Sequence, residues 1–526
     1  MRHTHPPRRV GTAAALAVLA AAALTTAGCS GTDERAPDNT LRVVTPFRVK
    51  SLDPVRQGLW APEWGYGELL MRPTEQAGVE PWLLKAVDRV DDTGWRLTLR
   101  EGVRFHNGRR LDGAALAACL QHHLTQNPTA RAALPGATAS ASGSTGVLLR
   151  TTRPAANLPA LLADESLFTV FDTQAVDAAG GDPAKLLAQR PYTGPFVVSA
   201  LDAQQLVLRR NPGYWGGPVR LAGATIRFVP DGQARVLAVR GGQADLAFYP
   251  PTESLRSLSG AREGDPAVVR SSPLPTSQLR AFLNTAAAPL DDTAVRRALA
   301  LAVDYRALAE QVLDRLYQAP TGLYPSTLPY AVSTTRTDRA AAGALLDQAG
   351  WRTGPDGVRA RGGQRLAVAV LAYSPQPDTR TVATALQAQL RTAGFEATVR
   401  EVPENYTAMR ESAGWHLGLS FDAALGTGFD PVGPFNDFLR TGAPDNLGRV
   451  QDQELDRLVD QLGAAFDTTE RDRLLARAQQ LVMVDRAYLL MLAQRPARVV
   501  AGRGWQRYPA SSVLMHLTAA TGPDQR

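Results

Sequence analysis

The chain has 526 residues, of which 44% are hydrophobic and 20% charged, and its formal net charge is +7. This length exceeds what one hydrophobic core usually serves, so two or more domains are expected. The composition excludes a disordered chain and a multi-span membrane protein. No run of basic residues concentrates the positive charge, which argues against a nucleic-acid-binding surface.

Residues 1–28 have the pattern of a cleaved export signal. Arg2, Arg8 and Arg9 precede an almost continuously apolar run at 13–24, which is too short to span a bilayer permanently. The sequence Thr-Ala-Gly-Cys at 26–29 is similar to a bacterial lipobox, so cleavage would leave Cys29 as a lipid-bearing first residue. The Arg8-Arg9 pair leaves twin-arginine export as an alternative route. Residues 29–40 are polar and predict a tether.

Cys119 is the only cysteine besides Cys29. With Cys29 acylated it has no partner, so no intramolecular disulfide is expected even in a compartment that permits disulfides. Its Ala-rich surroundings predict a small core residue.

The first half of the chain predicts strands, hairpins and a capped helix. Residues 41–44 predict the first strand, and residues 67–71 have a helix-like pattern. Trp95, Leu97 and Leu99 alternate with polar residues, the period of a half-buried strand. After a hairpin signal at Asn107-Gly108, Asp112 is placed to cap a helix that runs to about residue 124.

The next segments predict a loop at 130–146, a strand hairpin at 196–210 and a helix at 232–240. In the stretch 278–304, a short strand ends at Asn284 and a helix follows Asp291 or Asp292. Apolar residues at helical spacing give that helix one buried face.

The second half predicts a strand at 366–373, a helix at 379–393 and a strand at 396–402, which is the order of a right-handed βαβ unit. A helix at 340–351, a strand at 416–421 and two helices at 453–466 and 469–484 are also expected. The last predicted strand spans 488–493, and the segment 497–517 is expected to return to the first domain.

No catalytic motif stands out in the sequence. It lacks a His-Glu-x-x-His zinc motif, a Gly-x-Ser-x-Gly elbow and a phosphate-binding loop that ends in Lys-Ser/Thr. His122 and His123 are adjacent, so on a helix their side chains diverge by about 100° and predict a solvated pair rather than a metal site. An enzyme is therefore not expected.

Several blocks resemble one protein family in order and spacing. They are Leu52-Asp-Pro, Glu80-Pro-Trp-Leu, Leu99-Arg-Glu-Gly-Val-Arg-Phe-His-Asn-Gly, Tyr192-Thr-Gly-Pro-Phe, Asn211-Pro-Gly-Tyr-Trp-Gly-Gly, and Asn284-Thr with Asp291-Asp-Thr-Ala-Val-Arg-Arg-Ala-Leu. Together they resemble the extracytoplasmic solute-binding proteins, family 5, that serve peptide and nickel ABC importers. The resemblance covers about residues 41–493.

The resemblance implies an α/β fold of the two-lobed periplasmic-binding-protein (Venus-flytrap) type, with an extra subdomain in the first lobe. The implied division is a first lobe at 41–283 with an insertion at about 76–190, a second lobe at 284–493, and a return at 494–526.

The same resemblance implies a function in transport. The protein would capture a small peptide or peptide-like solute between its lobes and deliver it to ABC permease subunits, as a lipid-anchored monomer on the extracytoplasmic face of the membrane. The alternative in the same family is a nickel or other metal-chelate binder. A ligand sensor, an extracytoplasmic chaperone and a secreted hydrolase are the alternatives from other classes, and no cofactor is expected.

The candidate ligand-binding residues are Trp60, Trp64, Tyr406, Gly426, Thr427 and Phe429. Aromatic walls suit an organic ligand, although each ring has core packing as its alternative. Thr427 stands where peptide-binding members often carry an aspartate for the peptide amine, so ordinary charge pairing there is not expected. Between Phe435 and Gly448 there is no histidine of the kind that nickel-binding members often use.

Overall fold

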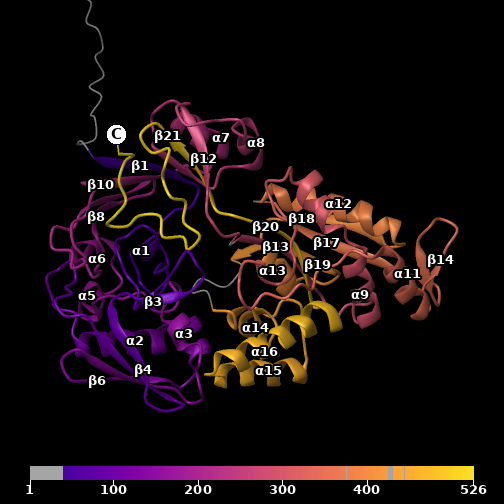
Figure 1. The fold of residues 1–526 in the computed structure, drawn as a ribbon, viewed down its shortest axis with the longest axis horizontal. Helices are drawn as coiled ribbons and strands as arrows, with labels where there is room; N and C mark the ends of the chain where they lie inside the picture. The colour runs from indigo at the N-terminus through magenta and orange to yellow at the C-terminus, as the bar shows by residue number, and fades with distance from the viewer. Residues whose placement is uncertain (1–38, 276, 375, 424–429, 444, 526) are drawn as a thin grey trace, which may run out of the picture. The chain divides into compact units, whose positions relative to one another are not determined.

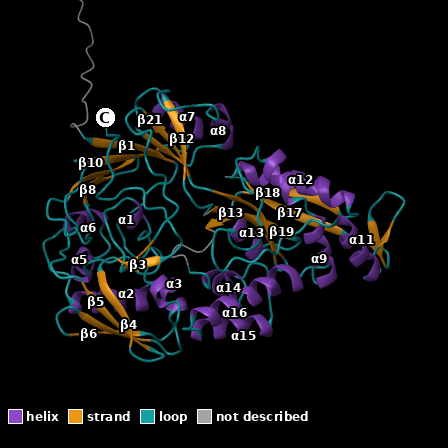
Figure 2. Ribbon diagram, in the orientation of Figure 1, coloured by secondary structure: helices purple, strands orange, loops and turns teal. Residues whose placement is uncertain are grey.

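The computed structural model describes residues 39–275, 277–374, 376–423, 430–443 and 445–525. In these ranges the chain is mixed α/β, with two large sheets and several small ones (Figure 1, Figure 2). No helix among them is long and apolar enough to span a bilayer.

The first large sheet combines strands from both ends of the chain, in the order β12-β21-β11-β1-β10-β9-β8. The strands are β1 (Thr40–Thr45), β8 (Phe196–Leu201), β9 (Gln205–Arg210), β10 (Gly223–Phe228), β11 (Leu246–Phe248), β12 (Ala267–Ser271) and β21 (Arg498–Gly502). β1 is parallel to β10 and β11, whereas β21 is antiparallel to β11 and β12. In Figure 1 the yellow β21 accordingly lies beside the magenta β12.

Helices α7 (Gly232–Arg240) and α8 (Thr252–Ser257) flank this sheet. Asp231 fixes the start of α7, because its carboxylate accepts a hydrogen bond from the Ala234 amide at 2.6 Å. The core beneath the sheet is built from its inward-facing apolar residues together with aromatic side chains such as Phe196 and Trp505.

A second body, with its own core, is inserted between β1 and β8. Its antiparallel sheet has the order β4-β5-β7-β6 and is packed against α2 (Gly113–Gln126). The strands of this sheet are β4 (Leu84–Arg89), β5 (Gly94–Leu99), β6 (Thr138–Ser142) and β7 (Gly146–Arg150), and β2 (Met71–Pro73), β3 (Val79–Pro81), α3 (Pro128–Ala133) and α4 (Leu158–Leu161) lie in the same part of the chain. Helices α1 (Trp60–Glu63), α5 (Thr173–Ala179) and α6 (Pro183–Gln189) also lie between β1 and β8 in the sequence but contribute Ala61, Ala179 and Leu186 to the core of the first sheet. The alternation predicted for β5 is confirmed, since Trp95, Leu97 and Leu99 are all buried.

The second large sheet has the order β18-β17-β19-β13-β20. Its strands are β13 (Ser277–Leu283), β17 (Ala367–Tyr373), β18 (Glu396–Val402), β19 (Leu417–Ala423) and β20 (Leu489–Arg495). The predicted βαβ unit is present, because β17 and β18 pair in parallel on either side of α12 (Pro377–Thr392) in the sequence.

Both faces of this sheet are covered. In β13, Leu279, Ala281 and Leu283 join a core with α9 (Thr293–Ala302), α11 (Arg339–Gln348) and α12, whereas Phe282 joins a core on the opposite face. That second core contains residues of α13 (Asn405–Glu411), α14 (Gly433–Phe438), α15 (Gln453–Ala464) and α16 (Thr468–Gln480). The remaining elements are α10 (Tyr305–Ala307), the π-helices η1 (Leu308–Val312) and η2 (Leu481–Asp485), and a small sheet of β14 (Arg352–Thr353), β15 (Arg359–Arg361) and β16 (Gln364–Arg365).

We call the first sheet and the inserted body the first lobe, and the second sheet with its helices the second lobe. The chain passes between them from β12 to β13 and from β20 to β21. These connections are tied to each other, since the Ser272 amide donates to the Ala497 carbonyl and the Ala497 amide donates to Ser272 Oγ, both at 2.9 Å. The sheet pairing puts β13 in the second lobe, so the lobe boundary predicted at 283/284 differs by one strand.

Three local predictions are wrong. Residues 130–146 form the end of α3, strand β6 and the start of β7 rather than one loop, because β7 offers β6 an edge to pair with. The helix-like segment 67–71 leads into β2 instead. His123 is buried rather than solvated, and its ring Nε2 lies 2.8 Å from the Thr169 carbonyl oxygen. Burial lowers the pKa of His123 to about 4.

Candidate functional site

Aromatic side chains gather where the parallel strands of the first lobe end. The carboxyl ends of β1 and β11 lie at the same edge of the sheet, the usual place for ligand sites in α/β folds. Phe47 follows β1 and Tyr249 follows β11, and their rings meet edge to face at 4.7 Å. The Trp60 ring, from α1, lies 6.1 Å from Phe47, which is 45% exposed. We call Phe47, Trp60 and Tyr249 the aromatic cluster.

The carboxyl ends of the second-lobe strands carry a matching set. Arg495, at the end of β20, lies 4.8 Å from the centre of the Phe421 ring and donates to the Tyr317 hydroxyl at 3.2 Å. The Tyr317 hydroxyl in turn donates to the Asp378 carboxylate.

This hydrogen-bonded series reaches the first lobe, because the Thr252 hydroxyl of α8 donates to Asp378 at 2.8 Å. The charge of Arg495, a member of the same series, also acts on Tyr249. Burial raises the pKa of Tyr249 well above its ordinary value, and the positive charge of Arg495 acts in the opposite direction. Residues from β11, α8, β20 and α12 therefore meet at the junction of the lobes.

Carboxylates from both lobes approach each other at the same junction. Asp430 is buried in the second lobe, and one of its oxygens accepts a hydrogen bond from the first-lobe amide of Asn157 at 2.7 Å. Its other oxygen accepts from the Val432 amide at 2.9 Å. Burial raises the pKa of Asp430 to about 6, although these hydrogen bonds favour the charged form.

Asp437 lies on α14 and is exposed to solvent. The surrounding protein nevertheless shifts the pKa of its carboxyl. Burial raises the pKa of Asp437 to about 7, and the negative charges of Asp430 and Asp164 act in the same direction. Arg280 opposes them.

Two first-lobe carboxyls extend this set. Burial raises the pKa of Glu165 well above its ordinary range, and the charges of Glu63 and Asp164 add to the effect. Glu63 is itself buried, with its pKa raised by desolvation. We call Asp164, Glu165, Asp430 and Asp437 the junction carboxylates.

A family model matches a large part of the chain. Residues 78–446 match the model described as "Bacterial extracellular solute-binding proteins, family 5 Middle". The chain belongs to this family.

Its relatives in family 5 differ in what they bind. The chain is 27% identical over 460 residues to the nickel-binding periplasmic protein of Escherichia coli, covering 84% of this chain and 86% of the relative. It is 26% identical over 454 residues to the probable di/tripeptide-binding protein 5 of Pseudomonas aeruginosa, covering 80% and 82%. The fold is similar to that of NikA from Staphylococcus aureus in complex with Ni(L-His)2, with a TM-score of 0.76, 19% identity, and coverage of 92% and 100%.

Within this family 5 fold, the two predicted tryptophans have different surroundings. Trp60 belongs to the aromatic cluster and keeps part of its surface exposed. Trp64 is 1% exposed and packs edge to face on Phe248 at 5.6 Å, with His516 on another side. The geometry favours core packing for Trp64, and direct ligand contact by this residue stays a prediction without an exposed ring to support it.

Tyr406 is half-buried at the start of α13. Its ring packs edge to face on Phe282 at 6.4 Å, and the Arg410 guanidinium lies 5.9 Å from its centre. Gly426, Thr427 and Phe429 lie outside the described residues, as does Cys29.

Sequence reasoning missed the aromatic partners and the carboxylates. Phe47 and Tyr249 directly follow buried parallel strands, and this position is the signal that could have identified them. Asp437 had no such signal, because its neighbourhood depends on Asp164, far away in the sequence. Among the described residues, no group of three or more His, Cys, Asp or Glu is arranged to hold a metal ion.

Proposed function

We propose that this chain is the solute-capturing component of an ABC importer and that its ligand is a small peptide or peptide-like zwitterion. Membership of family 5 supports the transport role. The relatives named for nickel and for di- or tripeptides leave both ligand classes as candidates.

One observation supports a zwitterionic ligand in particular. The solvent-exposed carboxylate of Asp437 is within electrostatic range of Asp430 and Asp164, so negative charge from both lobes acts on a place that solvent reaches. A ligand ammonium group would relieve this repulsion and gain charge-assisted hydrogen bonds. In this arrangement Asp437 or Asp164 supplies the amine-binding charge that Thr427 cannot.

The other groups at the junction fit the rest of such a ligand. Arg495 lies on the second-lobe side and can pair with a ligand carboxylate. The aromatic cluster offers apolar surface to side chains or to a peptide backbone. The proposed binding set thus combines acidic, basic and aromatic side chains.

We infer how the protein captures its ligand from the two hydrogen-bonded connections between the lobes. Because residues of both lobes contribute to the set, a ligand that touches both favours the closed state by its differential affinity. The segments near Ser272 and Ala497 are where we place the hinge. The closed form would then be presented to permease subunits, and the ligand would be delivered unaltered, without enzymatic conversion.

The export signal at residues 1–28 indicates where the protein is located. We propose that Cys29 is lipidated and holds the protein as a monomer at the extracytoplasmic face of the cell membrane. A soluble ligand sensor with the same fold is distinguished by whether a permease accepts the loaded protein.

The alternative ligand is a metal chelate. Guanidinium and aromatic groups can hold an organic chelator whose metal needs no protein ligand, so the described residues accommodate this candidate as well. The charge of the site distinguishes the peptide from the metal chelate, because the junction carboxylates would repel a carboxylate-rich chelator.

Native mass spectrometry on residues 30–526, exposed to host extract, tests the proposal first. A bound mass that fragments as a peptide supports the zwitterion, and a metal isotope pattern with an organic chelator replaces it. Calorimetry then compares a bound peptide with its N-acetyl derivative.

The variant Asp437→Asn should weaken the free-amine peptide at least tenfold and leave the acetylated peptide unchanged. Asp347→Asn, on α11 of the second lobe, is the matched control, because that carboxylate is exposed and its ion pairs stay within the same lobe. Equal affinity of Asp437→Asn and wild type for the free amine would remove the junction carboxylates from recognition.

A further inference from the structure

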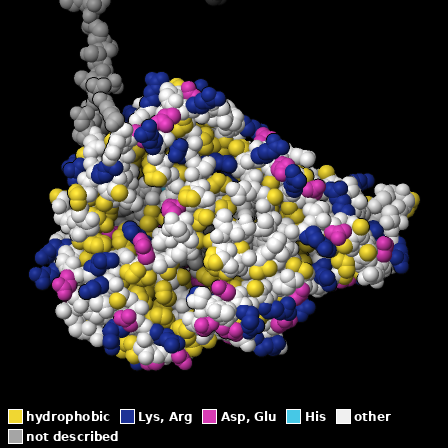
Figure 3. Space-filling model, viewed as in Figure 1, with side chains coloured by type: hydrophobic (Ala, Val, Ile, Leu, Met, Phe, Trp, Pro, Cys, Tyr) yellow, Lys and Arg dark blue, Asp and Glu magenta, His cyan; other side chains and the backbone are white. Residues whose placement is uncertain are grey.

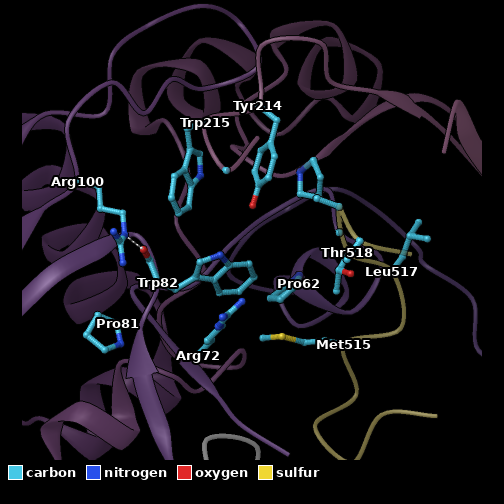
Figure 4. Close-up of a pocket in the computed structure, with 15 residues that line it drawn as sticks. Pro62, Arg72, Pro81, Trp82, Arg100, Tyr214, Trp215, Met515, Leu517 and Thr518 are labelled. Carbon is cyan, nitrogen blue, oxygen red and sulfur yellow. Dashed lines mark hydrogen bonds between the residues drawn. The ribbon is translucent and has the colours of Figure 1, made fainter. Parts of the chain in front are cut away.

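A pocket of about 430 Å³ lies in the first lobe and shares no lining residue with the aromatic cluster. The β2–β3 hairpin, the loop at 214–216 and the C-terminal segment at 515–520 supply most of its lining, and Pro62, Gly65, Trp82, Arg100 and Pro195 complete it. Its volume is within the range of small-molecule sites. Figure 4 shows Trp215 and Tyr214 above the Trp82 ring, with Pro62 beside that ring and Met515 below it.

The aromatic wall is held in place from behind. Glu68 is fully buried, and its carboxylate accepts hydrogen bonds from the Tyr214 hydroxyl at 2.8 Å and from Trp215 Nε1 at 3.0 Å. With their polar atoms engaged by Glu68, both rings leave apolar surface to the pocket. Gly216 permits this arrangement, since a Cβ there would lie 2.5 Å from the Tyr214 ring.

Two arginines line the same pocket. Arg100 Nε donates to the Trp82 carbonyl oxygen at 2.7 Å, and its guanidinium lies 5.6 Å from the centre of the Trp215 ring. Arg72 extends beside the Trp82 ring in Figure 4 and pairs at the exposed rim with Glu80 at 2.6 Å. Both guanidinium groups therefore keep their positions through contacts with the pocket wall.

The charge balance selects the ligand class. The pocket lining, as far as the structure describes it, includes two guanidinium groups and no carboxylate. Glu80 pairs with Arg72 from outside the lining, and Glu68 lies behind the rings. An aromatic cage for an ammonium ion would need the ring faces free of cations, and Arg100 already lies over Trp215. A planar anion stacks on the rings and pairs with the arginines.

We propose that this first-lobe pocket is a second binding site, for a small planar aromatic carboxylate, separate from the solute site at the lobe junction. The ring of the ligand stacks against Trp82 and Trp215, and its carboxylate pairs with the guanidinium of Arg72. The site is independent of the proposed transport ligand.

Indole-3-acetate is the probe, added to the mature protein in which 5-fluorotryptophan replaces tryptophan. Fluorine NMR should show shifts for Trp82 and Trp215, assigned through Trp→Phe variants, with Trp351 in the second lobe unchanged. Tryptamine, which carries the same ring with a positive charge, should bind at least tenfold more weakly. Shifts confined to Trp60 would place the probe at the junction and overturn the proposal.

Two variants test the residues by calorimetry. Arg72→Gln should weaken indole-3-acetate at least tenfold and have little effect on neutral indole, whereas Arg96→Gln, an exposed arginine on β5, should change neither. Trp60→Ala impairs the junction site only and should leave the probe affinity unchanged. No detectable binding at millimolar probe, or equal affinity of Arg72→Gln and wild type, would reject the second site.

Discussion

Replacing Asp430 with asparagine should make the stability of the second lobe less sensitive to pH. Asp430 is 5% exposed, and burial raises its pKa from 3.8 to about 6. A raised carboxyl pKa means that the folded state binds the proton more tightly than the unfolded state. The stabilising contribution of the protonated form is therefore complete below the unfolded pKa and is lost as the pH rises through the folded value.

The magnitude follows from the two pKa values. The difference between 3.8 and about 6 corresponds to roughly 3 kcal/mol of unfolding free energy. Asparagine keeps the shape and can still accept the hydrogen bond from the Val432 amide, while Asn157 can turn its amide to present oxygen. The unfolding free energy of Asp430→Asn minus that of wild type should thus rise by roughly 2 kcal/mol between pH 4 and pH 7, because pH 4 already lies just above the unfolded pKa and part of the full difference is lost below it.

Urea unfolding of both proteins across that pH range measures the difference, and titrations common to both cancel. Asp460→Asn on α15 serves as the comparison, because it removes the same charge from a carboxylate that is 56% exposed. A difference for Asp430→Asn that does not change with pH would show that Asp430 ionises at its ordinary pKa and would refute the account of an enclosed acidic junction.

Three further outcomes are expected. Trp64→Ala should cost about 3–5 kcal/mol of unfolding free energy, because Trp64 is a fully buried aromatic residue. Trp60→Ala should cost under about 1.5 kcal/mol and should lower the ligand affinity measured by calorimetry. The reverse pattern would exchange their roles. Burial raises the pKa of the Cys119 thiol to about 12, so a thiol reagent at pH 8 should label it only after unfolding, and rapid labelling of the native protein would contradict its burial. Cys29→Ser should move the protein from the membrane to the soluble fraction of the producing cell, and unchanged membrane association would reject the lipid anchor.

Much of the fold could be predicted because it is encoded locally. Asp112 and Asp231 mark the starts of α2 and α7 through hydrogen bonds to amides three residues ahead, and such signals are readable in sequence. The lobe boundary is different. Strand β13 reads as the end of the first lobe until its pairing with β19 and β20 is known, and those partners lie more than one hundred residues away.

The candidate site was less predictable for the same reason. Trp60 and Trp64 are four residues apart and chemically identical, but only the structure shows that one meets Phe47 and the other Phe248. Asp430 precedes Pro431 in the sequence, and nothing in its neighbourhood along the chain indicates the hydrogen bond from Asn157. Electrostatic neighbours that belong to different lobes leave no periodic pattern in a sequence.

The distribution of the junction carboxylates over two lobes links recognition to closure. Asp164 belongs to the first lobe and Asp430 and Asp437 to the second, so their mutual repulsion opposes any arrangement that brings them together. A ligand cation removes that opposition, and so does protonation. Ligand-free protein should therefore be more compact at pH 5 than at pH 7.5, because Asp437, with its pKa raised to about 7, is neutral only at the lower pH. Small-angle scattering measures this, and identical radii of gyration at both pH values would separate ligand recognition from lobe closure.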